Sequence, residues 1–203
     1  PASGAGSTGR LWPEIETALR GVLERWEARF TERPGDAPRL ARQAVQDGFD
    51  MLVCIGGDGS MNEVVTGLFA EREGAPEERL LRPGVVLASV RRGTGGDLAR
   101  LLGQSGTLPH SVAHLAGDRT RPCDLGFLAF QDHEGRRAWR GFLNIASFGL
   151  SGLCVDKVNR SSKALGGRAS FLIGLVKALL VYRPQAVRIE VDGATFHEGP
   201  LIT

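Results

Sequence analysis

The stretch "MLVCIGGDGSMNEVVTGL", residues Met51–Leu68, joins an apolar run to a glycine-rich turn and then to a helical pattern. The run Met51–Ile55 is short, partly β-branched and free of polar alternation. Such a run is typical of a strand covered on both faces in a parallel sheet. After Ser60, apolar residues recur at helical spacing as far as Phe69. A strand, a glycine turn and a helix start in this order commonly form a phosphate site, because backbone N–H groups can hold the anion.

The turn Gly56–Ser60 also has a simpler explanation, in which glycine is present only because a positive φ is needed. It is not a Walker loop, because no Lys-Ser/Thr pair follows the last glycine. It is not G-x-G-x-x-G either, because Asn62 stands sixth from Gly57. Asp58 would repel a phosphate unless a divalent cation lies between them or its carboxylate faces another partner.

Composition narrows the class of protein. The chain has 203 residues, 42% of them hydrophobic and 24% charged, which is ordinary for a globular protein with one large or two small domains. The formal net charge of +2 argues against a dedicated nucleic-acid binder. The cysteines Cys54, Cys123 and Cys154 form no C-x-x-C pair, so neither a zinc site nor a disulfide framework is indicated. We expect a reducing, cytoplasmic setting, with Cys54 acting as a small hydrophobe inside its strand.

Targeting and membrane signals are weak. No signal peptide opens the chain, and the start at Pro1 rather than Met suggests a trimmed N-terminus. The longest apolar stretch, Ser170–Tyr182, contains Lys177 and is too short for a membrane span. It predicts an amphipathic or buried helix, with a surface that meets lipid as the alternative.

The pattern of strand, glycine turn and helix occurs twice. A helix pattern over about Leu11–Phe30 and a second helix closing at Gly48 precede the first occurrence. The second occurrence has a strand over 85–90, a glycine turn over 93–96 and a helix over 97–102. Alternating strands and helices predict parallel βαβ units. Both glycine turns should then lie at the carboxyl edge of one sheet, where such folds place ligands.

The character of the sequence changes after residue 121. Short alternating stretches, an Asp-Gly turn and one helix predict mainly antiparallel structure, at Arg140–Ala146, Val187–Val191, Asp192-Gly193 and 170–182. We therefore expect an α/β fold with a parallel-sheet nucleotide-binding domain over 1–121. A partial β-rich lipid or substrate domain follows over 122–203, and it ends within a strand.

Six motifs in order carry a resemblance to a known family. "GGDGSMNEVVTGL" resembles the signature Gly-Gly-Asp-Gly-Thr/Ser-x-Asn-Glu-Val-x-Asn-Gly-Leu of the diacylglycerol kinase catalytic domain, and the chain is most similar to its bacterial lipid kinase branch, related to sphingosine and ceramide kinases. The other five motifs are "PASGAG", "TERPGDA", "GTGGDLAR", "CDLGFL" and "FLNIASFGLSG". The resemblance implies an NAD kinase/diacylglycerol kinase-like fold over nearly the whole chain.

The resemblance also implies a site. ATP would lie over the turn, with Thr31 and Thr94 contributing from neighbouring turns. The turn residues concerned are Gly56, Gly57, Asp58, Gly59, Ser60, Met61 and Asn62. Asp58, Asp97 and Asp124 match family carboxylates and are the candidates for organising Mg²⁺, water and the phosphates in catalysis. Three neighbouring carboxylates would repel one another without a cation.

Each acidic candidate has a structural alternative: a helix N-cap for Asp97, a turn residue for Asp124, and for Glu63 a helix-dipole contact. Departures from the family pattern are Gly96 in place of asparagine, Ser60, which keeps the hydroxyl, and Thr66 in place of asparagine.

The family's general base and metal sites are expected beyond Thr203, so we assign no metal ligand, and the fragment alone could be inactive.

The leading hypothesis is an ATP-dependent lipid kinase that transfers the γ-phosphoryl group to a hydroxyl of diacylglycerol or a related lipid. The alternatives are an NAD kinase-like enzyme, which shares Gly-Gly-Asp-Gly, and a non-catalytic nucleotide- or lipid-binding module. The expected partners are a lipid substrate and a membrane surface in transient contact, with no nucleic acid; a homodimer is compatible with them. The expected location is the cytoplasm, including the inner membrane surface.

Overall fold

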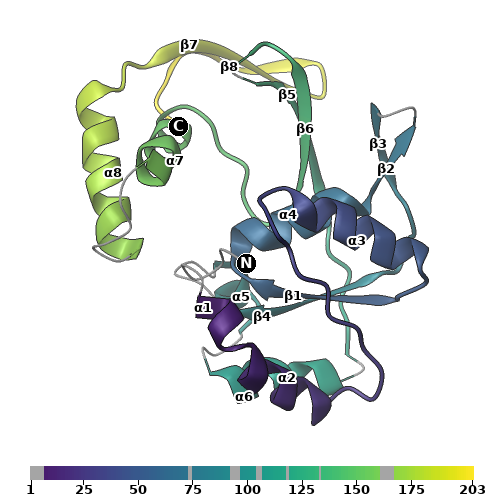
Figure 1. The fold of residues 1–203 in the computed structure, drawn as a ribbon. Coiled ribbons are helices and arrows are strands. Elements are labelled where there is room, and N and C mark those ends of the chain that lie inside the picture. The colour runs from purple at the N-terminus through teal and green to yellow at the C-terminus, as the bar shows by residue number, and fades with distance from the viewer. Residues whose placement is uncertain are drawn as a thin grey trace. The chain divides into compact units, whose positions relative to one another are not determined.

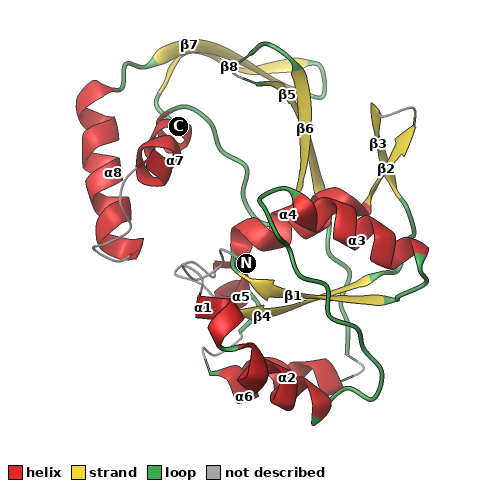
Figure 2. Cartoon of the chain, in the orientation of Figure 1, coloured by secondary structure: helices red, strands yellow, loops and turns green. Residues whose placement is uncertain are grey.

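The computed structural model describes residues 7–72, 75–91, 97–103, 107–117, 119–132, 134–160 and 167–203. The chain forms two compact units, Pro1–Asn144 and Ile145–Thr203 (Figure 1). Helices and strands alternate through most of the first unit, which gives the α/β class expected from the sequence (Figure 2).

Two parallel strands lie at the centre of the first unit. β1 (Met51–Gly56) pairs with β4 (Val86–Arg91) in a register that runs from Met51 opposite Val86 to Gly56 opposite Arg91. α4 (Asp58–Leu68) follows β1, and α5 (Asp97–Leu101) is the first described element after β4. Both strands therefore end at one edge, as predicted. The predicted glycine turn over 93–96 lies outside the described residues.

Both faces of this strand pair are covered. On one face, Val90 packs with Ile15 and Leu19 of α2 (Trp12–Arg20) and with residues of α6 (Leu108–Ala113) and the following 3₁₀ turn (His114–Ala116). On the other face the core residues are Cys54, Met61, Val65, Phe69 and Leu98. The absence of polar alternation in Met51–Ile55 is explained by this two-sided burial.

α3 (Asp36–Gln46) crosses α4 at close range. A Cβ added at Gly67 would lie 2.2 Å from the carbonyl oxygen of Pro38 and 2.9 Å from the Ala41 Cβ. Gly67 is therefore required by the contact between these two helices, and α3 ends before Gly48, whose φ is 94°. The second predicted helix is confirmed.

The first predicted helix is wrong beyond Arg20. α1 (Ser7–Arg10) and α2 are short, and the N–H groups of Val22 and Leu23 turn back to the carbonyl of Leu19 at 3.0 and 2.8 Å, which closes α2. The following segment runs extended. Its aromatic residues return to α2, where Trp12 meets Trp26 at 6.1 Å and Phe30 at 4.9 Å between ring centroids. The apolar pattern therefore identified residues that pack against the core, Leu19 buried and Val22, Leu23 and Trp26 partly buried, although Phe30 remains 50% exposed and the helix does not continue.

Two hairpins complete the first unit. β2 (Phe69–Arg72) and β3 (Ala75–Leu80) pair antiparallel in a stretch for which the sequence analysis predicted no strand. Arg42 of α3 holds this hairpin through Glu71 at 2.7 Å.

β5 (Gly126–Gln131) pairs with β6 (Arg137–Phe142), so the strand predicted over 140–146 starts and ends earlier. Because β6 packs on α4, the compact unit extends to Asn144, whereas the sequence places the domain boundary near residue 121.

The second unit holds α7 (Leu150–Arg160), α8 (Gly167–Val181), β7 (Gln185–Val191) and β8 (Ala194–Leu201). β7 and β8 form the predicted hairpin, and its turn residues Asp192 and Gly193 both have positive φ, 51° and 79°. Two central residues with positive φ are what a two-residue hairpin turn requires.

α8 is apolar on all sides and buries only part of its surface against α7. Ala178 is fully buried, and a Cβ at Gly174 would lie 2.4 Å from Val158 Cγ2. Leu172 and Leu180 are exposed, the latter by 80%. In the part of the chain that the structure describes, no helix combines the length and apolarity that crossing a bilayer requires.

Candidate functional site

The glycine turn after β1 leads directly into α4. Gly57 occupies the N-cap position in extended conformation, with φ −103° and ψ −175°, and no side chain caps the helix there. The first intrahelical bond runs from the Met61 N–H to the Gly57 carbonyl at 3.1 Å. The N–H groups of the first turn of a helix have no intrahelical acceptor, and they carry the positive end of the helix dipole. This end of α4 can therefore accept an anion.

The glycines of this turn do not serve to supply positive φ. Gly56, Gly57 and Gly59 are absent from the described glycines with positive φ. Gly56 is needed for space instead, because a Cβ there would lie 2.7 Å from Ser60 Oγ. A Cβ at Gly59 would meet nothing within 4 Å. The simpler explanation of the turn, a requirement for left-handed backbone, does not hold for these residues.

Asp58 connects the two helix starts at this edge. Its Oδ2 accepts the N–H of Asp97 at 2.9 Å, and its Oδ1 accepts the N–H of Leu98 at 3.4 Å. Asp58 is half-buried at the start of α4, and the two donors are the first residues of α5. A carboxylate at a helix start is stabilised both by these bonds and by the helix dipole. The sequence left two kinds of partner open for Asp58, a divalent cation or another group of the protein. The structure shows the second kind, the backbone N–H groups of Asp97 and Leu98.

The remaining predicted carboxylates are more open. The side chain of Asp97 is 57% exposed and forms an ion pair with Arg100 one turn along α5. Asp124 is exposed in the segment before β5, and its carbonyl lies 3.6 Å from Cys123 Sγ. Among the described residues, no three His, Cys, Asp or Glu side chains come together as a metal site. Two carboxylates of the predicted set thus face solvent, while Asp58 is engaged by amides.

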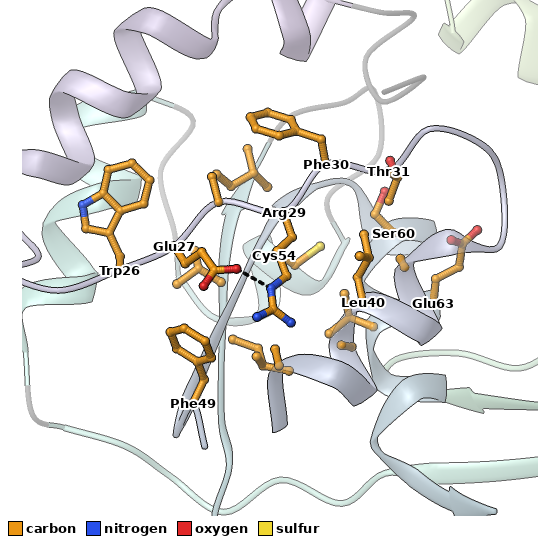
Figure 3. Close-up of a pocket in the computed structure, with 18 of the residues that line it drawn as sticks. Trp26, Glu27, Arg29, Phe30, Thr31, Leu40, Phe49, Cys54, Ser60 and Glu63 are labelled. Carbon is orange, nitrogen blue, oxygen red and sulfur yellow. Dashed lines mark hydrogen bonds and ion pairs between the residues drawn. The ribbon is translucent and has the colours of Figure 1, made fainter. Parts of the chain in front are cut away.

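Thr31 and Ser60 lie on the wall of one cavity of about 450 Å³ (Figure 3). Ser60 and Glu63 come from α4, Leu40 from α3 and Cys54 from β1, and Thr31 ends the extended segment that follows α2. Most of the cavity wall is apolar. Thr94 lies outside the described residues.

Cys54 is chemically inert in this setting. The side chain is buried, and burial raises the pKa of the thiol to about 12, with a further contribution from the negative charge of Glu63. Only a thiolate is a good nucleophile, so the prediction that Cys54 acts as a small hydrophobe is confirmed.

Asn62 and Thr66 connect α4 to the β5–β6 hairpin. Asn62 Oδ1 accepts the N–H of Leu143 at 3.2 Å. The buried Thr66 hydroxyl accepts the N–H of Gly141 at 3.0 Å and lies 3.2 Å from the Gly141 carbonyl and 2.8 Å from the Asn62 carbonyl. The sequence noted Thr66 only as a departure from the family pattern. A polar residue between the buried Val65 and Gly67 was the available signal of this contact.

Asp36 fixes the turn that carries "TERPGDA". Its Oδ2 accepts the N–H groups of Glu32 and Arg33 at 2.9 and 3.0 Å. These backbone hydrogen bonds, assisted by the Arg33 side chain, lower the pKa of Asp36 below its usual range. Gly35 before it has a φ of 86°, which favours glycine. This motif therefore builds the start of α3.

Comparison with known proteins relates most of the chain to one family. The family described as "Diacylglycerol kinase catalytic domain" matches residues 1–128. A diacylglycerol kinase of Bacillus subtilis is 34% identical over 191 residues, covering 88% of this chain and 55% of the relative. One from Staphylococcus haemolyticus is 28% identical over 203 residues, covering 100% of this chain and 56% of the relative. The chain thus spans little more than half the length of these relatives.

The fold has a match among solved structures as well. A crystal structure of a diacylglycerol kinase from Bacillus anthracis superimposes with a TM-score of 0.63 at 23% identity, over 100% of this chain and 59% of that one. This likeness supports the fold class expected from the sequence. The family match over residues 1–128, more than half of the sequence, shows that the chain belongs to the diacylglycerol kinase catalytic domain family.

Proposed function

We propose that this chain is the nucleotide-binding part of an ATP-dependent lipid kinase, which transfers the γ-phosphoryl group to a hydroxyl of diacylglycerol or a related lipid. The observation that carries the proposal is the junction of α4 and α5. Two helices begin at one edge of the strand pair, joined through Asp58, and the first turn of α4 has no side-chain cap. Family membership supplies the reaction class, because the relatives are named diacylglycerol kinases.

In this proposal the phosphates of ATP lie against the N–H groups of Gly57–Ser60. Phosphoryl transfer requires little covalent participation from the protein, and it depends on positioning and on stabilising negative charge. The open space at Gly59 allows close approach of a phosphate to the backbone. Asp58 acts as a positioning residue, because both of its oxygens already accept backbone N–H groups.

Mg²⁺ fits the exposed carboxylates better than Asp58. In phosphate complexes Mg²⁺ keeps several waters and takes only one or two protein carboxylates, so a three-acid cluster is unnecessary. Asp97 and Asp124 are exposed and remain the candidates for organising the cation, and Asp97 would first have to release Arg100. When bound, the cation would offset charge on the phosphates.

The test is transfer of a radiolabelled γ-phosphoryl group by the untruncated protein, with diacylglycerol, ceramide, sphingosine and NAD as separate acceptors. We expect a labelled lipid and no labelled NAD, and we expect Asp58→Ala to lose most of the transfer. Glu77→Gln, in the β2–β3 hairpin, is the matched control that keeps it. Labelled NAD would assign the alternative enzyme, and ATP binding without transfer would assign a non-catalytic module.

A lipid acceptor also implies transient contact with a membrane surface. Co-sedimentation of the untruncated protein with vesicles that contain diacylglycerol measures this contact. Analytical ultracentrifugation of the same sample determines whether a homodimer forms.

A further inference from the structure

Two histidines share one face of the helical stretch Leu108–Ala116. His110 lies in α6, and His114 begins the 3₁₀ turn that continues this helix. Residues four apart in sequence are neighbours on the surface of a helix. The two imidazole rings are in contact, with ring centroids 4.7 Å apart and an angle of 86° between the ring planes. The fold thus brings two side chains of the commonest metal-ligating type together.

The backbone that carries this pair is fixed by packing. Ser111, Val112 and Leu115 come between or directly after the histidines in sequence, and all three are buried. Val112 and Leu115 belong to the core cluster that contains Ile15 of α2 and Val90 of β4, and α6 lies beside α2 (Figure 1). Because the other face of this helical stretch is buried, the spacing between the two histidines is set by the fold and needs no ligand.

The ring nitrogens of both histidines are available to a ligand. Both residues are exposed, and neither side chain forms a hydrogen bond or an ion pair with another described residue. Nitrogen atoms bound to one Zn²⁺ at about 2.0–2.1 Å lie no more than about 4.2 Å apart. Rings whose centroids are 4.7 Å apart can reach this separation by rotation of the side chains, without movement of the backbone.

We propose that His110 and His114 together bind one divalent transition-metal ion of the class that suits imidazole, represented by Zn²⁺, Ni²⁺ and Cu²⁺. Two histidines at i and i+4 on one face of a helix are the pair of ligands that helical zinc motifs present. Among the described residues no third His, Cys, Asp or Glu completes a cluster, so water takes the remaining coordination positions. A structural zinc site has four protein ligands, whereas this pair makes an open site whose metal exchanges with solution.

The class of metal separates this site from the Mg²⁺ of the proposed kinase reaction. Mg²⁺ is a hard cation that takes oxygen ligands rather than imidazole. The candidates for Mg²⁺, Asp97 and Asp124, are carboxylates of other segments. The imidazole site is therefore independent of the kinase function, and either can fail without the other.

A bound ion would connect α6 to the 3₁₀ turn. One metal bond comes from His110 in the helix and the other from His114 at the start of the turn, so both elements are held by the same ion. A ligand that binds only the folded chain stabilises it. We therefore expect Zn²⁺ to slow the backbone hydrogen exchange of Leu108–Ala116, where local opening would separate the two ligands.

The experiment is calorimetric titration of the untruncated protein, free of any histidine tag, with ZnCl₂, NiCl₂ and MgCl₂. It is carried out at about pH 7.5, because imidazole ligates metals in its neutral form. We expect a binding event with Zn²⁺ and with Ni²⁺ that Mg²⁺ neither produces nor displaces. His110→Ala and His114→Ala should each weaken it by about tenfold or more, since a single imidazole lacks a second ligand held on the same scaffold.

A relocated histidine provides the matched control. The double variant His114→Ala with Ala116→His keeps the number of histidines but takes the second one out of the i, i+4 spacing. Ala116 is exposed, so the fold has room for the larger side chain. We expect this variant to bind Zn²⁺ as weakly as His114→Ala, and we expect neither variant to show slower exchange of Leu108–Ala116 when Zn²⁺ is added.

Several results would overturn the assignment of this metal site. Absence of a binding event with both Zn²⁺ and Ni²⁺ means that the ring contact is packing only. Equal affinity in the parent protein and the two single variants means that other groups bind the ion. Tight binding by the relocated variant means that the spacing on the helix does not matter, and displacement of Zn²⁺ by Mg²⁺ means that oxygen ligands hold the ion. No readout depends on kinase activity.

Discussion

The carboxylate of Asp58 accepts the backbone N–H of Asp97 at 2.9 Å across a sequence separation of 39 residues. One side chain thereby joins the helix that follows β1 to the helix that follows β4. The two strands deliver these helix starts to the same edge, because Gly56 and Arg91 are partners in the parallel register. The signature aspartate is thus a structural connection between the starts of α4 and α5.

The first prediction concerns the loss of this connection. Asp58→Ala leaves the N–H groups of Asp97 and Leu98 without their charged acceptor, and we expect a loss of about 1–3 kcal/mol in the free energy of unfolding. Asp97→Ala, which removes an exposed pair with Arg100, should cost about 1 kcal/mol or less. Urea unfolding measures both. Equal losses in the two variants would show that Asp58 does not hold α5.

The second prediction separates two glycines of the same turn. In Gly56→Ala the new Cβ would lie 2.7 Å from Ser60 Oγ, and such overpacking costs about 1–3 kcal/mol. Gly59→Ala meets nothing within 4 Å and should be neutral or stabilising by up to about 1 kcal/mol. Thermal unfolding tests the difference.

Removing the Ser60 side chain tests whether its clash with the new Cβ causes the loss of stability in Gly56→Ala. The double variant Gly56→Ala with Ser60→Gly removes the contacting side chain, so most of the lost stability should return, as a coupling between neighbouring sites. If the double variant is less stable than Gly56→Ala alone, the clash is not the cause. For Gly59→Ala we also expect weaker ATP binding by calorimetry despite an intact fold, because the methyl group enters the space that the proposed phosphate uses.

The sequence was most informative where one strand and its turn form a single local pattern. Met51–Ile55, Gly56–Ser60 and the helix after them could be predicted because buried strands lack polar alternation and the family motif spans the turn. The predicted helix over Leu11–Phe30 failed because helical spacing of apolar residues indicates packing contacts and not the path of the chain, and Trp26 and Phe30 contact Trp12 of α2 after the chain has reversed. Apolar spacing alone cannot separate these two cases.

Long-range partners were the part of the site that the sequence could not supply. Asp58 could be recognised as unusual, but its partners lie 39 and 40 residues away. Thr66 bonds Gly141 at a separation of 75 residues, and nothing in the local sequence names that partner. The hairpin β2–β3 was missed because its strands are rich in charge and include Pro76, which strand propensity disfavours.

The third prediction tests the connection between Thr66 and Gly141. Thr66→Val keeps the shape but leaves the buried Gly141 N–H without its acceptor, which should cost about 1–3 kcal/mol. Thr66→Ser keeps the hydroxyl and loses only a methyl group, so its cost should be about 1 kcal/mol. Urea unfolding should rank valine below serine. The reverse order would mean that the methyl group matters more than the hydrogen bond.

The last prediction is a pH dependence at Asp36. Backbone N–H groups of Glu32 and Arg33 lower the pKa of this carboxyl in the folded chain below its value of about 3.9 in the unfolded chain. As pH falls, the unfolded chain therefore takes up its proton first, and stability falls with it. The contribution of Asp36 is fully present above about pH 5 and is lost as pH falls through the folded pKa.

Asp36→Asn isolates this effect, because asparagine is nearly the same size and does not titrate in this range. Unfolding free energies of both proteins between about pH 6 and pH 2.5 should differ most at the upper end and converge at the lower end. A difference that stays constant over this range would mean that Asp36 stabilises the turn by shape alone. A difference that grows toward acid would reverse the sign of the pKa shift and remove the assigned cause.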